Sequence, residues 1–154
     1  MKFIKVNRLN EYAFINKAHH NDAGFDIRAC LSKEIYPDQK LTIPSMEWRT
    51  IPTGISLCMP DDIHAVIRSR SGLAWNAGVF VLNSPGTIDS GYLGEIKVIL
   101  MNLGKNDYII RNGTRIAQIV FINNPNVCIF GEGIDHNLNN PTPRNEKGFG
   151  STGM

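Results

Sequence analysis

Residues 83–95, NSPGTIDSGYLGE, combine the side chains best suited to chemistry in this chain. They place a carboxylate, Asp89, three residues before an aromatic ring, Tyr92. A carboxylate can orient a water molecule and accept its proton, and an aromatic ring can pack against a sugar or a base. The Pro-Gly pair between two strand-like runs predicts a hairpin with unpaired backbone near its tip. Strict alternation sends Asp89 and Tyr92 to opposite faces unless Gly91 marks a bulge, so a glycine-rich turn with a packing tyrosine stays an alternative.

A cationic and hydroxyl-rich stretch, RSRSG, occupies residues 68–72. It opens the one segment with a helical pattern, residues 71–78, which ends on a glycine suited to a C-terminal cap. Free N–H groups and the positive end of a helix dipole favour an anion there, and phosphate is the natural guest. The alternative is a surface arginine pair with Ser71 as an ordinary N-cap. The chain has no G-x-x-x-x-G-K-[ST] loop, which excludes a Walker-type NTPase.

Two other polar residues stand in apolar surroundings. Asp26 lies within AGFDI where a strand begins, a position equally typical of a turn aspartate that caps local N–H groups. Gln118 ends the stretch GTRIAQ, a turn that runs into an apolar strand. A buried glutamine requires hydrogen-bond partners, which are either backbone groups or a ligand.

The chain ends on GFGSTGM, which contains G-x-G-x-x-G. A dinucleotide fold needs a strand before these glycines, a helix after them and an acidic residue about 20 positions on. Only Met154 follows Gly153, so that interpretation is excluded. The remaining interpretations are an anion-binding backbone helped by nearby Arg144 and Lys147, or a disordered terminus.

The elements that would position these residues are short strands. Val-, Ile- and Phe-rich runs separated by Gly, Pro, Asn and Asp, with one helix, predict an all-β jelly roll or distorted barrel. We expect one β domain over residues 1–130 and a polar C-terminal arm over 131–154. The strand-like runs are 1–9, 41–60, 63–69, 79–83, 95–102, 114–122 and 126–130.

The composition narrows the partners. A net charge of +2 without a basic run does not predict binding to nucleic acid. No apolar stretch reaches the roughly 18 residues that a membrane span requires. We therefore expect a cytoplasmic protein without a nucleic-acid or membrane partner. Three widely spaced cysteines predict small core residues rather than disulfides. The residues in this group are Cys30, Cys58 and Cys128, with Trp48 also expected in the core and His19, His20 and Trp75 at the surface or in packing.

Taken in order, these pieces resemble the five motifs of the homotrimeric dUTPases. The resemblance covers nearly the whole chain and implies a jelly roll whose glycine-rich tail closes over a neighbouring subunit's active site. Ser69 departs from it, because the family often has proline there, and so does the spacer Asn145-Glu146-Lys147. The matching stretches are 23–27, 70–74, 86–94, 113–118, and Arg144 with 148–153.

The resemblance also implies roles for individual residues. Asp89 would activate the water that attacks the α-phosphorus of dUTP, giving dUMP and pyrophosphate, which limits uracil in DNA and supplies dUMP for thymidylate synthesis. Asp26 would hold Mg²⁺ through a water molecule. A homotrimer with shared sites would bind the substrate through Arg70, Ser71, Gly72, Asn83, Gly86, Thr87, Ile88, Tyr92, Lys97, Gln118, Arg144, Phe149, Gly150, Ser151 and Thr152.

Base and sugar selection follow from hydrogen bonding and space. Backbone groups and the Asn83 amide can imitate adenine towards uracil, while cytosine would leave buried polar groups unpaired. Tyr92 under the deoxyribose would leave no room for a 2′-hydroxyl. Two other functions remain open: a dCTP deaminase, which shares the fold, and a catalytically silent trimer that binds dUTP or a regulatory partner.

Overall fold

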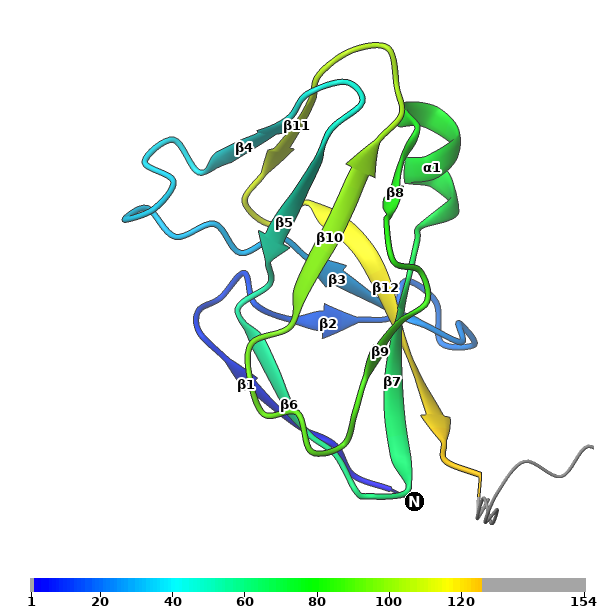
Figure 1. The fold of residues 1–154 in the computed structure, drawn as a ribbon. Coiled ribbons are helices and arrows are strands. Elements are labelled where there is room, and N and C mark those ends of the chain that lie inside the picture. Colours follow the sequence, from blue (N-terminus) through cyan, green and yellow to red (C-terminus); the bar gives the residue numbers. More distant parts are fainter. Residues whose placement is uncertain (1, 126–154) are drawn as a thin grey trace, which may run out of the picture.

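The structure, a computed structural model, describes residues 2–125, which form antiparallel strands and one short helix (Figure 1). The elements are β1 (Lys5–Arg8), β2 (Ile15–Asn16), β3 (Phe25–Arg28), β4 (Lys40–Ile43), β5 (Trp48–Pro52), β6 (Ile55–Cys58), β7 (Ile63–Arg68), α1 (Ser71–Ala77), β8 (Val79–Val81), β9 (Gly86–Ile88), β10 (Lys97–Asn102), β11 (Tyr108–Arg111) and β12 (Arg115–Asn123).

The strands form two principal sheets with the core between them. One sheet has the order β2-β3-β12-β7-β9, and the other has the order β5-β10-β8, with β1-β6 and β11-β4 as smaller pairs. In Figure 1 the three-stranded sheet lies in front of β3 and β12, with α1 beside β8. This jelly-roll-like, mostly β architecture confirms the predicted fold class.

Alternation along the strands separates the core from the site. On β7, Ala65 and Ile67 are buried in the core cluster, whereas Arg68 is exposed. The neighbouring strand β12 pairs Gln118 with Arg68 and Ile119 with Ile67. Because neighbouring paired residues share a face, the polar residues 68 and 118 lie together on the outer face of the five-stranded sheet.

Several predicted strand boundaries were wrong. The run 41–60 divides into three strands, and β1 keeps only four residues of the run 1–9. The strands β2, β9 and β11 were not predicted, because each has at most four residues and is held mainly by its partner strand. The run 126–130 lies outside the described residues.

The predicted helix and its C-terminal glycine cap are confirmed, whereas the alternative with Ser71 as an ordinary N-cap is contradicted. Gly78 ends α1 in the left-handed conformation with φ 67°, and its N–H donates to the carbonyl of Ala74. Ser71 is the first helical residue, and Arg70 occupies the N-cap position without a side-chain capping bond. Within residues 2–125 no helix is long and apolar enough to cross a bilayer.

Two residues expected in the core are at the surface. Trp48 is 54% exposed because β5 is an edge strand and Trp48 stands on its outward face. Cys58 ends β6 on the exposed face, whereas Cys30 is buried, and burial raises the pKa of the Cys30 thiol.

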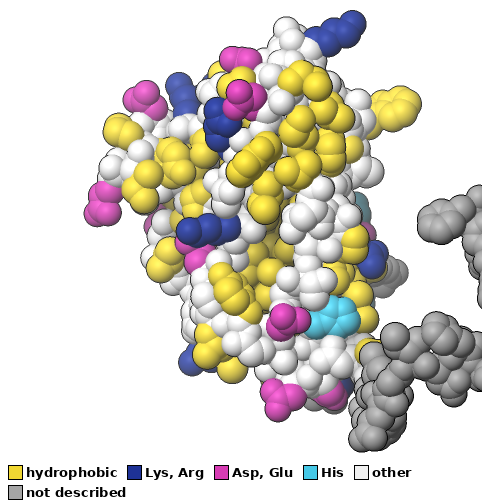
Figure 2. Space-filling view, viewed as in Figure 1, with side chains coloured by type: hydrophobic (Ala, Val, Ile, Leu, Met, Phe, Trp, Pro, Cys, Tyr) yellow, Lys and Arg dark blue, Asp and Glu magenta, His cyan; other side chains and the backbone are white. Residues whose placement is uncertain are grey.

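Figure 2 shows hydrophobic side chains gathered over β8 and β10. His19, His20 and Trp75 are exposed, within the surface-or-packing expectation, and Cys128 lies outside the described residues.

Gly54 generates the first prediction. Its φ is +65°, and an added Cβ would approach the Cβ of Ala13 and the Sγ of Cys30 to 2.8 Å. We expect Gly54→Ala to lower the free energy of unfolding by about 3 kcal/mol, through backbone strain and overpacking. Urea unfolding measures this change. Gly91→Ala is the control, because no atom lies within 4 Å of its added Cβ, and an equal loss in both variants would contradict the prediction.

Candidate active site

The first half of the candidate site is built around Asp26 on β3. Its two carboxylate oxygens accept hydrogen bonds from different guanidinium groups: Arg70 Nε donates to Oδ1 at 3.0 Å, and Arg115 Nη1 donates to Oδ2 at 3.0 Å. The Asp26 side chain is only 12% exposed, so these charge-assisted bonds are partly shielded from water. Asp26 therefore joins the end of β7 to the beginning of β12.

Arg70 is held at a second point. Its Nη1 donates to the backbone carbonyl of Arg115 at 3.1 Å. Among the described residues Nη2 of Arg70 has no hydrogen-bond partner, so one edge of the guanidinium remains available to an anion. One carboxylate and two guanidinium groups leave the cluster with a net positive charge.

Gln118 connects β12 to the turn before α1. Its Nε2 donates to the carbonyl of Ser69 at 3.0 Å, and the Ser69 hydroxyl accepts from the N–H of Val81 at 3.0 Å. Gly24 leaves room for this side chain, because a Cβ there would stand 2.8 Å from Oε1 of Gln118. The Ser69 hydroxyl thus ties the turn to β8.

The start of α1 adds backbone donors to this cluster. The N–H groups of Leu73 and Ala74 both turn back to the carbonyl of Arg70. Those of Ser71 and Gly72 have no partner in the described part of the chain, and α1 has no acidic side chain in its first turn. Two free N–H groups at a helix start favour an anion.

A polar pocket of about 210 Å³ adjoins the cluster. It lies on the outer face of the five-stranded sheet and mixes acidic, basic and amide groups. Its lining includes Asp22, Gly24, Asp26, Arg68 and Gln118.

The second half of the site is the connection from β8 to β10. A hairpin was predicted there, and β8 does pair with β10, but β9 within the connection pairs with β7. Gly91, where a bulge was one possibility, lies instead in a turn in which the N–H of Tyr92 donates to the carbonyl of Asp89 at 3.1 Å. The Asp89 side chain is exposed and has no hydrogen-bond or ion-pair partner among the described residues.

Glycines shape both ends of this connection. A Cβ on Gly86 would stand 3.2 Å from Nδ2 of Asn83, so the Asn83 amide lies against the backbone there. A Cβ on Gly94 would stand 2.7 Å from the hydroxyl of Tyr92, which donates to the carbonyl of Glu95 at 2.9 Å. The Tyr92 ring is therefore held at its edge while 45% of the residue stays exposed.

The two halves lie at opposite ends of β7. Ile88 pairs with Ala65, so Asp89 follows opposite residue 64, while Arg70 follows the other end of the strand at Arg68. Four residues of strand separate residues 64 and 68 by about 13 Å. Arg70 extends farther away still, towards Arg115.

The structure thus brings some predicted site residues together and leaves others apart. Asp26, Arg70 and Gln118 meet beside the start of α1, and Asn83, Gly86, Asp89 and Tyr92 share the other loop. Thr87 is exposed and pairs with Val66, whereas Ile88 packs against the core and Lys97 is exposed on β10. The predicted arm residues Arg144, Phe149, Gly150, Ser151 and Thr152 lie outside the described residues.

Two residues with structural importance were missed. Arg115 lies in the fourth motif, but its partner Asp26 is 89 positions away, so no local pattern predicts the pair. Glu95 follows a glycine-rich loop that resembles many others. Its proximity to Tyr92 was the one available signal.

Several solved dUTPase structures share this fold. A Staphylococcus bacteriophage 80alpha dUTPase with dUpNHpp superposes over the full length of both chains with a TM-score of 0.81 and 21% identity. The native EIAV dUTPase gives a TM-score of 0.66 at 24% identity, covering 88% of this chain and 98% of that one. At these identities the likeness defines the fold class, a dUTPase-like β protein.

Sequence comparison carries the assignment further. A family model described as dUTPase matches residues 10–153. Deoxyuridine 5′-triphosphate nucleotidohydrolases of Clostridium novyi and Rickettsia rickettsii are each 42% identical, covering 97% and 98% of this chain and 97% of each relative. The chain belongs to the dUTPase family.

The Asp26 cluster generates the second prediction. Asp26→Ala leaves two guanidinium groups facing each other without their common acceptor. We expect it to lower the free energy of unfolding by about 2 kcal/mol, with a smaller loss at high salt. Glu47→Ala, which breaks the exposed pair with Arg49, is the control and should cost less than about 1 kcal/mol. Chemical denaturation of both variants measures the difference, and equal losses would contradict the bridging role of Asp26.

Proposed function

We propose that this chain hydrolyses dUTP to dUMP and pyrophosphate in a site shared between subunits. The observation that carries the proposal is the division of the site. A cationic cluster lies at one end of β7, and at the other end a carboxylate without a partner among the described residues lies beside an anchored aromatic ring. Family membership and relatives named for this reaction support it.

The cationic cluster binds the phosphate chain. Arg70 presents its free guanidinium edge, and the N–H groups of Ser71 and Gly72 add donors at the start of α1. Gln118 fixes the turn between them through Ser69. Phosphoryl transfer asks the protein mainly for positioning and charge stabilisation, and these groups supply both.

Asp89 supplies the base. Its carboxylate, exposed and without a partner among residues 2–125, accepts a proton from water, whose oxygen attacks the α-phosphorus. The bond from the α-phosphorus to the bridging oxygen breaks, and pyrophosphate leaves with that oxygen. Uracil is held between the backbone around Gly86, Thr87 and Ile88 and the amide of Asn83, with Lys97 along the same wall.

Tyr92 lies under the deoxyribose and selects the sugar. Its hydroxyl is engaged by Glu95, so the exposed part of the residue is the ring. A ring held in this way leaves no space for a 2′-hydroxyl. Arg144, Phe149, Gly150, Ser151 and Thr152 on the arm close the site over the phosphates and the base, as the resemblance implies.

The residues around Asp26 fit Mg²⁺ as an ion bound mainly by the substrate. Residues 2–125 contain no cluster of three His, Cys, Asp or Glu side chains, so this part of the chain offers no complete metal cage. Each Asp26 oxygen keeps a free lone pair after accepting one guanidinium, which suits a bond from metal-held water. When bound, Mg²⁺ neutralises phosphate charge. A neighbouring phage phi11 dUTPase structure is described with a structural Mg(II) ion.

The third prediction tests the base. Asp89→Asn removes the proton acceptor but keeps the side-chain shape, so we expect kcat to fall by about 10³ while dUpNHpp still binds with near wild-type affinity. Product chromatography and calorimetry measure the two quantities. Asp38→Asn, at an exposed aspartate without a hydrogen-bond partner in residues 2–125, should behave as wild type. Wild-type turnover in Asp89→Asn would refute its role, and dUTP formed from dCTP would identify a deaminase instead.

The fourth prediction tests the shared site. Asp89→Asn and Arg70→Ala chains, each inactive alone, are mixed, unfolded and refolded together. If Asp89 and Arg70 of one site come from different chains, random assembly restores about a quarter of the sites. Activity per chain and size by light scattering give the result. Refolding each variant by itself is the control, and no recovery in mixed trimers would show that both residues act within one chain.

A further inference from the structure

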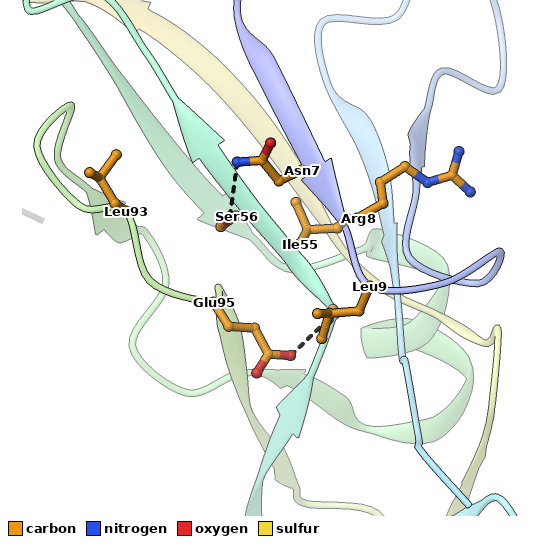
Figure 3. A pocket seen from close by; sticks show the side chains of 8 residues that line it. Asn7, Arg8, Leu9, Ile55, Ser56, Leu93 and Glu95 are labelled. Atoms are coloured by element: carbon orange, nitrogen blue, oxygen red, sulfur yellow. Dashed lines mark hydrogen bonds between the residues drawn. The ribbon is translucent and has the colours of Figure 1, made fainter.

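The loop that carries Tyr92 is fastened at its C-terminal end to the turn between β5 and β6. The N–H of Gly54 donates to Oε1 of Glu95 at 2.7 Å, as Figure 3 shows. Next to it the hydroxyl of Thr53 donates to the carbonyl of Ile96 at 2.6 Å. The N–H of Ile96 donates in turn to the carbonyl of Ile55 at 2.8 Å.

The turn that receives these bonds is rigid. Thr53 is fully buried, and Gly54 holds a φ of +65° with Ala13 and Cys30 packed where a side chain would begin. The carbonyl of Gly54 also accepts the N–H of Leu9, which ties the turn to the end of β1. The turn is therefore a fixed reference point for the loop.

Glu95 joins that reference point to the aromatic ring. Its carboxylate accepts from Gly54, and its own carbonyl accepts the Tyr92 hydroxyl at 2.9 Å. Glu95 thus contacts the Gly54 turn through its carboxylate and the Tyr92 hydroxyl through its backbone carbonyl. An acceptor that carries a negative charge makes the stronger of these bonds.

Packing does little to hold the loop on this side. A pocket of about 200 Å³ lies between the β1-β6 pair and the loop, lined by residues that include Leu9, Ile55, Leu93 and Glu95 (Figure 3). Leu93 is 67% exposed. Next to the buried Ile96, the Glu95 carboxylate is therefore the side chain of the loop that bonds to the Gly54 turn across this open hollow.

We infer that Glu95 is a positioning residue for sugar selection, acting through Tyr92. The inference rests on the proposed place of Tyr92 under the deoxyribose. Rejection of a 2′-hydroxyl depends on a ring that cannot retreat, and a shift of about 1 Å at such a contact is enough to change selectivity. Without the Glu95 anchor the ring can move away and admit a ribonucleotide.

The test compares kcat/KM for dUTP and UTP in full-length variants. Glu95→Ala should lower the dUTP-to-UTP ratio about tenfold, the equivalent of one charge-assisted hydrogen bond. Glu95→Gln keeps an acceptor oxygen and should stay within about twofold of wild type, whereas Glu95→Asp is too short to reach Gly54 and should resemble Ala. Glu34→Ala, at an exposed glutamate, is the matched control. If Glu95→Ala does not fold, the Gln and Asp variants decide the question.

A double-mutant cycle with Tyr92→Phe distinguishes positioning from a separate structural effect. If Glu95 acts through the Tyr92 hydroxyl, the double variant should lose no more selectivity than the larger single loss. Additive losses, or an unchanged ratio in Glu95→Ala, overturn the inference. Tyr92→Ala separates the two proposals. If Tyr92→Ala keeps the wild-type dUTP-to-UTP ratio, the sugar contact of Tyr92 is refuted and the role of Glu95 with it. If Tyr92→Ala lowers this ratio and Glu95→Ala does not, only the role of Glu95 is overturned.

Discussion

Ile67 pairs with Gly86 and Ala65 with Ile88, and this antiparallel register between β7 and β9 decides how the site is organised. It directs Asp89 towards the beginning of β7, whereas Arg70 leaves from the end of the same strand. Side chains at opposite ends of a strand cannot act on one phosphate. The register therefore supports the proposal that one site is shared between two subunits.

Polar contacts between distant segments then hold each half in place. Asp26 bridges Arg70 and Arg115 at one end, and Glu95 ties the Tyr92 loop to Gly54 at the other. Asp26 uses both carboxylate oxygens for these bonds, and Glu95 uses Oε1. The apolar core positions the strands, but the loops beyond the strands have few apolar contacts, so these bonds set their positions.

Local patterns predicted much of this arrangement. The alternation on β7 and β12 and the glycine at residue 78 are signals that a few neighbouring residues are enough to define. The β fold and the helix end that they predicted are confirmed. The short strands, the exposed Trp48 and the place of Cys58 depend on which strand lies beside which, and a single sequence does not state this. The ion pair of Arg115 with Asp26 was missed for the same reason, because the two residues are 89 positions apart in the sequence.

The carboxylates of Asp26, Glu95 and Asp89 differ in their hydrogen-bond partners, and this difference bears on their proposed roles. Those of Asp26 and Glu95 already accept hydrogen bonds from Arg70, Arg115 and Gly54, so a proton taken from water would weaken contacts that support the fold. Asp89 has no such partner among residues 2–125 and is exposed. A general base must gain a proton and release it in every turnover, and only a carboxylate without a structural duty does this at no cost to the surrounding loops. The hydrogen-bond network therefore supports the proposed assignment of Asp89 as the base and of Asp26 and Glu95 as positioning residues.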